Sequence, residues 1–386
     1  MKPIGALHIE AALEPYGADM STQTPSPEWV LTLKPYVPGK PIEDVKRELG
    51  LSHVVKLASN ENPLGPSPKA IAAMTAAVAE VHLYPDPGAY ALRQAIGERF
   101  SVDPNRVIVS NGSNETVTLL TRAFCTPSEN VVFSQYGFVA YRVVSGAAGV
   151  GQKQVPALGL GCDLKAMAAA CDENTRLLFL ANPNNPTGTW SRRDDVVELL
   201  RNVPEHVLVV LDEAYCEYVD DPDYPDGLSL LGERENLIVM RTFSKAYGIA
   251  GVRVGYAVAP DYVCDRVNRI REPFNVNHVG QTGAIAALGD SEHLAKVVSL
   301  NNSERTRVGD ALRGLGLEVE HTQTNFVLIT VPSGGGAFYE GCLRRGVITR
   351  PLQPYGLHEH VRVTLGTREE NDAFLVAAAA TLGEVQ

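Results

Sequence analysis

Short apolar runs alternate with amphipathic segments through the middle of the chain. The runs are rich in β-branched residues and comprise 107–110, 131–134, 177–181, 207–212, 237–240 and 254–259. Segments with helical periodicity, such as 115–124 and 192–201, separate them. Apolar strands that are buried on both faces and alternate with helices are typical of a doubly wound α/β fold. The pattern therefore predicts an α/β fold in which a mostly parallel central sheet forms a large domain.

After residue 280 the pattern changes, because two helical stretches precede three strand candidates and a last helix. This order predicts a smaller α+β domain at the C-terminal end. Before the first helical pattern, a stretch rich in Pro, Ser, Thr and Ala shows no periodicity. We expect a flexible N-terminal arm (1–28), an N-terminal segment that joins the small domain (29–60), the large α/β domain (61–280) and the small C-terminal domain (281–386).

Composition narrows the classes of protein that remain. The chain has 386 residues and a formal net charge of −11, which argues against nucleic acid or an anionic membrane as the main partner. No apolar run reaches membrane-spanning length, and the N-terminus lacks the pattern of a signal peptide. The six cysteines are scattered without a C-x-x-C pair, so neither a disulfide framework nor a metal site is expected. We expect a cytoplasmic protein.

Polar residues that could react or bind a ligand follow several of the predicted strands. In sheets of this kind, ligands bind at the ends of the strands. Lys245 follows the run 237–240 and is flanked by small hydroxyl residues. A desolvated lysine can lose its proton and attack an aldehyde, and Ser244 and Arg253 could hold a phosphate nearby. The alternative is an ordinary surface lysine.

Two further strand ends carry groups that suit a pyridine ring. Asp212 ends the run 207–212, and a carboxylate beside a pyridine nitrogen would keep that nitrogen protonated. Asn185, between two Asn-Pro steps, and Tyr215 could donate to a phenolic oxygen. A strand-end cap for Asp212 and a structural turn for Asn185 are the alternatives.

A third strand end precedes a predicted helix. Ser113 and Asn114 lie where the free amides of that helix would bind an anion, although an ordinary capped helix would look the same. Tyr136 follows the run 131–134 and could stack on a cofactor ring, or equally be a core tyrosine.

Taken together and in this order, these stretches resemble the fold-type I pyridoxal-5′-phosphate (PLP) aminotransferases of class I/II, and most closely the histidinol-phosphate aminotransferase family. The resemblance runs from about residue 33 to the C-terminus. It is carried by LASNENP (57–63), YPD (84–86), NPNNPTG (182–188), DEAY (212–215), TFSKAYGIAGVR (242–253) and RVTLGTREE (362–370).

The resemblance implies a role for each matching residue. Lys245 would bond covalently to PLP and later move the proton, while Asp212 would pair with the pyridinium nitrogen. Asn185 and Tyr215 would bind the ring oxygen, and Tyr136 would stack on the ring. The residues implied in phosphate binding are Ser113, Asn114, Thr242, Ser244, Arg253 and, from a second subunit, Tyr84. The last of these implies a homodimer with a shared active site.

The implied reaction moves an amino group between a small-molecule amino donor and a 2-oxo acid by a ping-pong mechanism. Arg362 would bind the substrate anion, Arg350 a second anionic group, and Tyr36 and Asn60 would lie at the substrate. The first substrate pair is histidinol phosphate (or imidazole-acetol phosphate) with glutamate and 2-oxoglutarate. The run 350–357 also resembles a subgroup that accepts aromatic amino acids, so a phenylalanine/tyrosine aminotransferase is the main alternative. A PLP-dependent decarboxylase and a non-catalytic PLP or amino-acid sensor also stay open.

Overall fold

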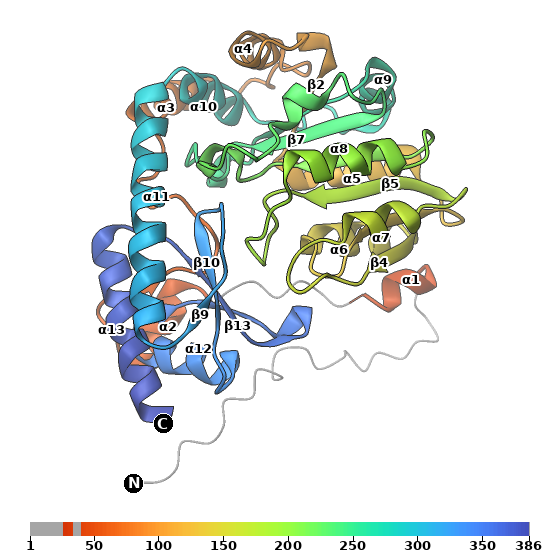
Figure 1. The fold of residues 1–386 in the computed structure, drawn as a ribbon. Helices are drawn as coiled ribbons and strands as arrows, with labels where there is room; N and C mark the ends of the chain where they lie inside the picture. The colour runs from red at the N-terminus through yellow and green to blue at the C-terminus, as the bar shows by residue number, and fades with distance from the viewer. Residues whose placement is uncertain (1–25, 34–39, 386) are drawn as a thin grey trace, which may run out of the picture.

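The computed structural model describes residues 26–33 and 40–385. A large sheet is built from β2 (Val107–Ser110), β3 (Asn130–Ser134), β4 (Gly151–Val155), β5 (Thr175–Ala181), β6 (Leu208–Asp212), β7 (Leu237–Thr242) and β8 (Gly255–Val258). Its seven strands lie in the order β2-β8-β7-β6-β5-β3-β4 (Figure 1). Every neighbouring pair is parallel except the two that β8 makes with β2 and β7. The prediction of an α/β fold with a mostly parallel sheet is confirmed.

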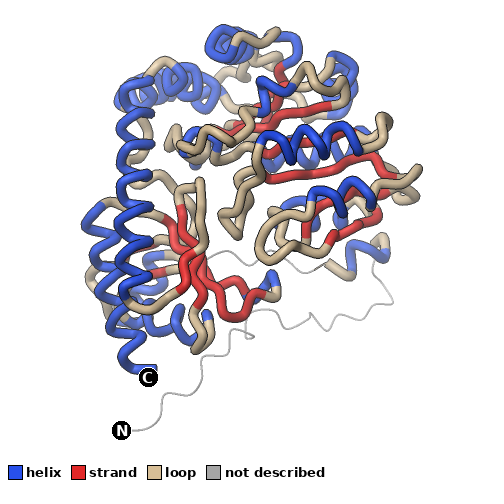
Figure 2. Tube along the Cα trace, viewed as in Figure 1, coloured by secondary structure: helices blue, strands red, loops and turns tan. Residues whose placement is uncertain are grey.

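Helices cover both faces of this sheet (Figure 2). One face carries α5 (Ser113–Phe124), α6 (Val139–Ala147) and α9 (Asp261–Ile270), and the other carries α7 (Leu164–Ala169) and α8 (Arg193–Asn202). Successive residues of a strand serve opposite faces. In β5, Leu177 packs in one apolar cluster with Val117 of α5, whereas Leu178 packs in another with Leu199 of α8. Burial on both faces explains why the strands read as unbroken apolar runs.

Three more helices pack at the β2 end of the sheet. They are α3 (Pro68–Ala77), α4 (Tyr90–Phe100) and α10 (His278–Leu288). Ala70, Leu92 and Ala284, one from each helix, share an apolar cluster with Val107 and Val109 of β2. Short 3-10 helices occupy Val78–Glu80, Pro104–Arg106, Cys216–Tyr218, Gly227–Leu230, Ala250–Val252 and Gln353–Tyr355.

The C-terminal part forms a second, smaller body. Its antiparallel sheet has the order β12-β13-β10-β9 and is made of β9 (Glu318–Val319), β10 (Phe326–Thr330), β12 (Arg350–Leu352) and β13 (Leu357–Thr364). The helices are α11 (Ser291–Gly314), α12 (Gly335–Arg344) and α13 (Arg368–Val385). In Figure 1 the long helix α11 runs beside both bodies and links them.

The N-terminal segment contributes to both bodies. Strand β1 (Val55–Lys56) pairs in parallel with β11 (Val347–Ile348), and helix α2 (Ile42–Leu49) buries Val45 with Leu343. Helix α1 (Glu28–Leu31) instead lies against α6, where Trp29 covers Gly149 so closely that a Cβ there would lie 2.7 Å from the indole. We therefore propose that the segment joining the small domain starts at α2 rather than at residue 29.

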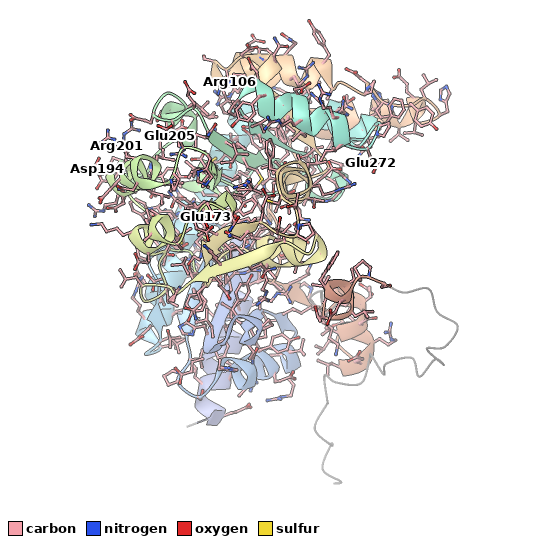
Figure 3. The ribbon with its side chains drawn as sticks, turned by 90° about the vertical axis from the view of Figure 1, so that its right-hand side faces the viewer. Arg106, Glu173, Asp194, Arg201, Glu205 and Glu272 are labelled. Atoms are coloured by element: carbon pink, nitrogen blue, oxygen red, sulfur yellow. The ribbon has the colours of Figure 1, made fainter. Side chains whose placement is uncertain are left out.

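The outer elements of the large body are covered with charged side chains of both signs. Figure 3 shows Arg106, Glu173, Asp194, Arg201, Glu205 and Glu272 on them. Within residues 26–33 and 40–385, none of the helices combines the length and apolar character needed to cross a bilayer.

Candidate active site

Two cavities lie where the large sheet faces the small body, beside the carboxyl ends of β5, β6 and β7. The inner cavity has a volume of about 270 Å³ and the outer about 1080 Å³. Ser59, Phe138, Asn185 and Lys245 line both, so the cavities adjoin. In open α/β sheets ligands bind at this edge, and the site predicted from the sequence lies there.

Lys245 and Asp212, the two residues on which the sequence prediction depends most, line the same inner cavity. The Lys245 amine donates to the Ser59 carbonyl at 3.4 Å and lies 5.8 Å from the centre of the Tyr215 ring. Burial, and to a smaller extent the nearby Arg362, lower the pKa of Lys245 to about 8. Near neutral pH an appreciable fraction of this amine is therefore neutral and nucleophilic.

Asp212 is the last residue of β6 and is buried. Its carboxylate accepts a hydrogen bond from the Tyr141 hydroxyl at 2.7 Å and one from the Ala214 backbone amide at 3.3 Å. Burial raises the pKa of Asp212 to about 6, and the Tyr141 hydrogen bond opposes that rise. A cation placed beside this carboxylate would lower its pKa again and would be stabilised by it.

Tyr141 was not identified from the sequence. It is fully buried on α6, and its ring stacks on Phe179 of β5 at a centroid distance of 4.7 Å. A buried tyrosine normally directs its hydroxyl to a polar partner, and here the partner is the carboxylate of the predicted site. Only the general rule that buried hydroxyls are paired could have pointed to it, because the sequence does not show which strand α6 covers.

A cradle for a phosphate lies at the N-terminus of α5. Ser113 and Asn114 form the first turn of this helix and line the inner cavity together with Thr242, Ser244 and Arg253. Arg253 donates to the Ser244 hydroxyl at 3.2 Å. Free amides at a helix N-terminus and a guanidinium are both suited to a phosphate.

Two glycines make this close arrangement possible. A Cβ at Gly112 would lie 2.1 Å from an Arg253 guanidinium nitrogen, and Gly112 has a positive φ of 77°. A Cβ at Gly255 would lie 2.4 Å from the Ser113 backbone nitrogen. Since neither position tolerates a side chain, the backbone and Arg253 can approach one small anion together.

Asn185, Tyr215, Asn60 and Arg362 form a polar wall around the lysine. Arg362 of β13 donates to the Asn185 amide oxygen at 2.5 Å and to the Ala58 carbonyl at 2.7 Å. Asn60 donates to the Tyr215 hydroxyl at 2.8 Å. Burial raises the pKa of Tyr215 to about 12, so this hydroxyl keeps its proton at neutral pH and remains a donor.

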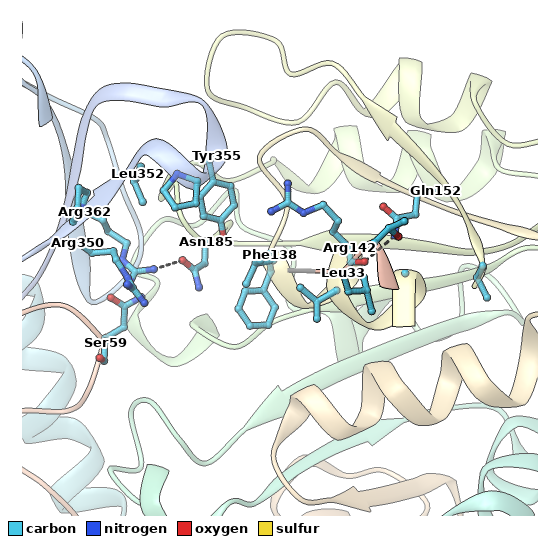
Figure 4. A pocket seen from close by; sticks show the side chains of 18 of the residues that line it. Leu33, Ser59, Phe138, Arg142, Gln152, Asn185, Arg350, Leu352, Tyr355 and Arg362 are labelled. Carbon is cyan, nitrogen blue, oxygen red and sulfur yellow. Dashed lines mark hydrogen bonds between the residues drawn. The ribbon is translucent and has the colours of Figure 1, made fainter. Parts of the chain in front are cut away.

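Arg350 lies next to Arg362. The two residues are direct cross-strand partners on β12 and β13, so their side chains point to the same face of the sheet. Both line the outer cavity, and Figure 4 shows their guanidinium groups close to each other and to Ser59. The structure thus brings together two cations at the wall of the cavity that also contains Lys245.

Tyr136 follows β3 as predicted, but it lines neither of the two cavities. Strand β3 ends at Ser134, and the Gly137 amide bonds to the Ser134 carbonyl, so Tyr136 lies in a turn. Its ring packs beside the apolar cluster of Leu328, Leu352 and Leu357. Phe138 lines both cavities instead and is the better candidate for the face of a bound ring.

Of the remaining two predicted residues, Tyr84 belongs to the described part of the chain and Tyr36 does not. Tyr84 is 82% exposed and stacks on Phe274 at 4.6 Å, and it lines neither cavity of its own chain. Tyr36 lies outside the described residues. The roles predicted for both stay predictions.

Known proteins resemble this chain over most of its length. A family model described as "Aminotransferase class I and II" matches residues 52–377. The chain is 48% identical over 355 residues to histidinol-phosphate aminotransferase 2 of Pseudomonas fluorescens, covering 92% of this chain and 96% of the relative. It is also 48% identical to histidinol-phosphate aminotransferase of an Anaeromyxobacter species, over 92% of this chain and 99% of that one.

A solved structure extends the comparison to the fold and to a cofactor. It is the crystal structure of histidinol-phosphate aminotransferase from Sinorhizobium meliloti in complex with pyridoxal-5′-phosphate. The TM-score is 0.86 at 28% sequence identity, and the match covers 95% of this chain and all of that one (100%).

Proposed function

This chain belongs to the class I and II aminotransferases, and on that basis we propose that it transfers an amino group between histidinol phosphate and 2-oxoglutarate. The cofactor is pyridoxal 5′-phosphate. Glutamate and imidazole-acetol phosphate are the products of the proposed reaction, which proceeds in two half-reactions.

The residues of the inner cavity fit this cofactor. The cradle at the α5 N-terminus suits the cofactor phosphate, and Lys245 suits the cofactor aldehyde. The glycines at 112 and 255 leave this cradle open, because a side chain at either position would collide with it. Asp212 would face the ring nitrogen, while Asn185 and Tyr215 would donate to the ring oxygen. Bound PLP supplies an electron sink for the negative charge that forms when the substrate Cα loses its proton.

Each of these residues has a defined task in the proposed mechanism. Lys245, once released by the donor amine, is the general base that removes the Cα proton, for which a pKa of about 8 is well matched. Asp212 keeps the ring nitrogen protonated, and Tyr141 fixes the carboxylate by its hydrogen bond. Arg362 binds the substrate anion. Its hydrogen bond to Asn185 connects this anion-binding residue to a residue that would bind the cofactor.

The adjacent pair Arg350 and Arg362 is the observation that carries the choice of histidinol phosphate. A phosphate monoester carries close to two negative charges near neutral pH, whereas the carboxylate of an aromatic amino acid carries one. Two neighbouring guanidinium groups suit the phosphate, because each can donate a bidentate pair of hydrogen bonds. For phenylalanine or tyrosine one arginine would be sufficient.

Arg350→Met should therefore lower kcat/KM for histidinol phosphate by about 10- to 100-fold, the effect of losing one charge-assisted interaction. For phenylalanine the loss should be much smaller, since Arg362 remains. Both values are measured in the same preparation, with glutamate formation as the common readout. A wild-type preference for phenylalanine, or an equal loss for both substrates in the variant, would favour the aromatic aminotransferase instead. Carbon dioxide release without transamination would favour a decarboxylase.

The lowered pKa of Lys245 predicts the pH dependence of cofactor capture. Only the neutral amine attacks an aldehyde, and its fraction rises as the pH passes upward through the pKa. With a pKa of about 8, covalent capture of PLP by the apoprotein should become about tenfold faster between about pH 7 and pH 9 and then level off. Stopped-flow absorbance would follow the capture, with Nα-acetyl-lysine, whose side-chain amine is free and solvated, as the reference. A rate that keeps rising through about pH 10, as for an ordinary lysine, would contradict the assignment.

A homodimer with a shared active site also belongs to this proposal. The exposed Tyr84 ring, braced by Phe274, is available to the cofactor phosphate of a second copy rather than to its own cavity. The cytoplasm is the proposed location, which the free state of the six cysteines supports.

A further inference from the structure

The outer cavity extends beyond the paired arginines of β12 and β13 to helix α6. At that end it is lined by Phe138, Arg142, Pro354 and Tyr355. In Figure 4 the side chain of Arg142 leaves α6 and extends toward Tyr355, in the direction of Asn185 and the Arg350–Arg362 pair. A third guanidinium therefore faces the cavity that Lys245 also lines.

Nothing in the described part of the chain neutralises this group. The backbone carbonyl of Arg142 accepts from Gln152 at 2.8 Å, which holds the residue in place, but its guanidinium has no ion pair or hydrogen bond with any described residue. By contrast, Arg241 in the same body has two carboxylate partners, Glu213 and Asp226. A cation without a counter-charge at the wall of a cavity is suited to an anion of the ligand.

The chemistry of the two substrates indicates which anion this is. On the proposed function, Arg362 and Arg350 take the phosphate of histidinol phosphate or the α-carboxylate of glutamate. Among the residues that line the rest of this cavity, Phe138, Tyr355 and Arg142 would then be left for the other arm of the substrate. In histidinol phosphate that arm ends in an imidazole ring, which the two aromatic side chains can contact. In glutamate and 2-oxoglutarate it ends in a second carboxylate.

We infer that Arg142 is a specificity-determining residue that binds the distal carboxylate of the dicarboxylic substrate. A site that must accept both a ring and a carboxylate at one position needs a cation that does not obstruct the ring. Arg142 satisfies this condition because its side chain is exposed and can turn toward solvent when the ring is bound. The part of this inference that concerns the imidazole ring rests on the proposed function. The part that concerns the distal carboxylate requires only that glutamate is a substrate.

The test measures single half-reactions, in which the holoenzyme is mixed with one amino donor and the loss of the PLP absorbance is followed. Glutamate is compared with glutamine, which has the same shape but no distal charge. Arg142→Met should lower the preference for glutamate over glutamine by about 10- to 100-fold. Arg142→Lys should restore part of that preference, because it keeps the charge without the bidentate fork.

Two further measurements separate the possible causes. Arg122→Met, at an exposed arginine of α5 that lines neither cavity, should keep the wild-type preference. An unchanged preference in Arg142→Met, or an equal loss for glutamate and glutamine, would overturn the inference. If the wild-type enzyme did not react with histidinol phosphate, the proposed function would fail, whereas the glutamate–glutamine comparison would still decide the role of Arg142.

Discussion

Replacing Lys245 by alanine should reduce turnover at least about 10⁴-fold, because one substitution removes both the covalent attachment of PLP and the general base. The variant should still fold. Among the described residues, the lysine amine has one hydrogen bond, a long one of 3.4 Å to the Ser59 carbonyl, and burial disfavours its charged form. The variant keeps the residues that would bind the phosphate and the ring of PLP. PLP should therefore bind reversibly, and its absorption spectrum should change because the covalent bond to the lysine is missing.

Rates and bound PLP would be measured on the same sample, with Lys165→Ala as the matched control. Lys165 is an exposed lysine of α7 that lies outside both cavities, so its loss should leave turnover within about twofold. Turnover near the wild-type level in Lys245→Ala would exclude this lysine from the chemistry.

Replacing Asp212 by asparagine should lower kcat about 10²- to 10³-fold, the usual effect of removing one oriented charge from an active site. Asparagine keeps the shape of the side chain and can still accept the Tyr141 hydroxyl, so the packing around it should persist. What disappears is the negative charge that holds a proton on the ring nitrogen.

Asp194→Asn provides the comparison, since Asp194 is an exposed carboxylate in the first turn of α8. Thermal unfolding and PLP content should match the wild type in both variants, while kcat falls only in Asp212→Asn. A kcat within about threefold of wild type there would show that the ring nitrogen does not depend on this carboxylate.

The large sheet could be predicted because its central strands are buried on both faces. Each of the six apolar runs corresponds to an observed strand, from β2 to β8. Strand β4 was missed because it lacks this burial. It lies at the edge of the sheet next to β3, and four of its five residues, GQKQ, are exposed or half-buried and polar or small. An edge strand of this kind has no apolar run to reveal it.

The candidate site could be predicted where residues lie directly at strand ends. Lys245 and Arg253 share one stretch of sequence, while Asp212 and Asn185 lie in two others. The carboxyl edge of one sheet brings all four to one cavity. For such residues, the spacing of the motif is sufficient to predict the position, because the strand and the loop that follows it determine where the side chain lies.

Residues placed by a turn or by a helix face were not predictable in this way. Tyr136 and Phe138 differ by two positions, and only the turn after Ser134 decides which one reaches the cavity. Tyr141 and Arg142 are consecutive residues of α6, yet one is buried against Asp212 and the other faces the outer cavity. The orientation of α6 on the sheet determines these roles, and tertiary packing fixes that orientation.

The most direct test of this account is to locate the cofactor on the chain. Reduction of the holoenzyme with borohydride, followed by proteolysis and mass spectrometry, marks the lysine that carries PLP. We predict a phosphopyridoxyl group on the peptide that contains Lys245. Its recovery on a different lysine, or its absence from a protein that retains full activity, would contradict the account.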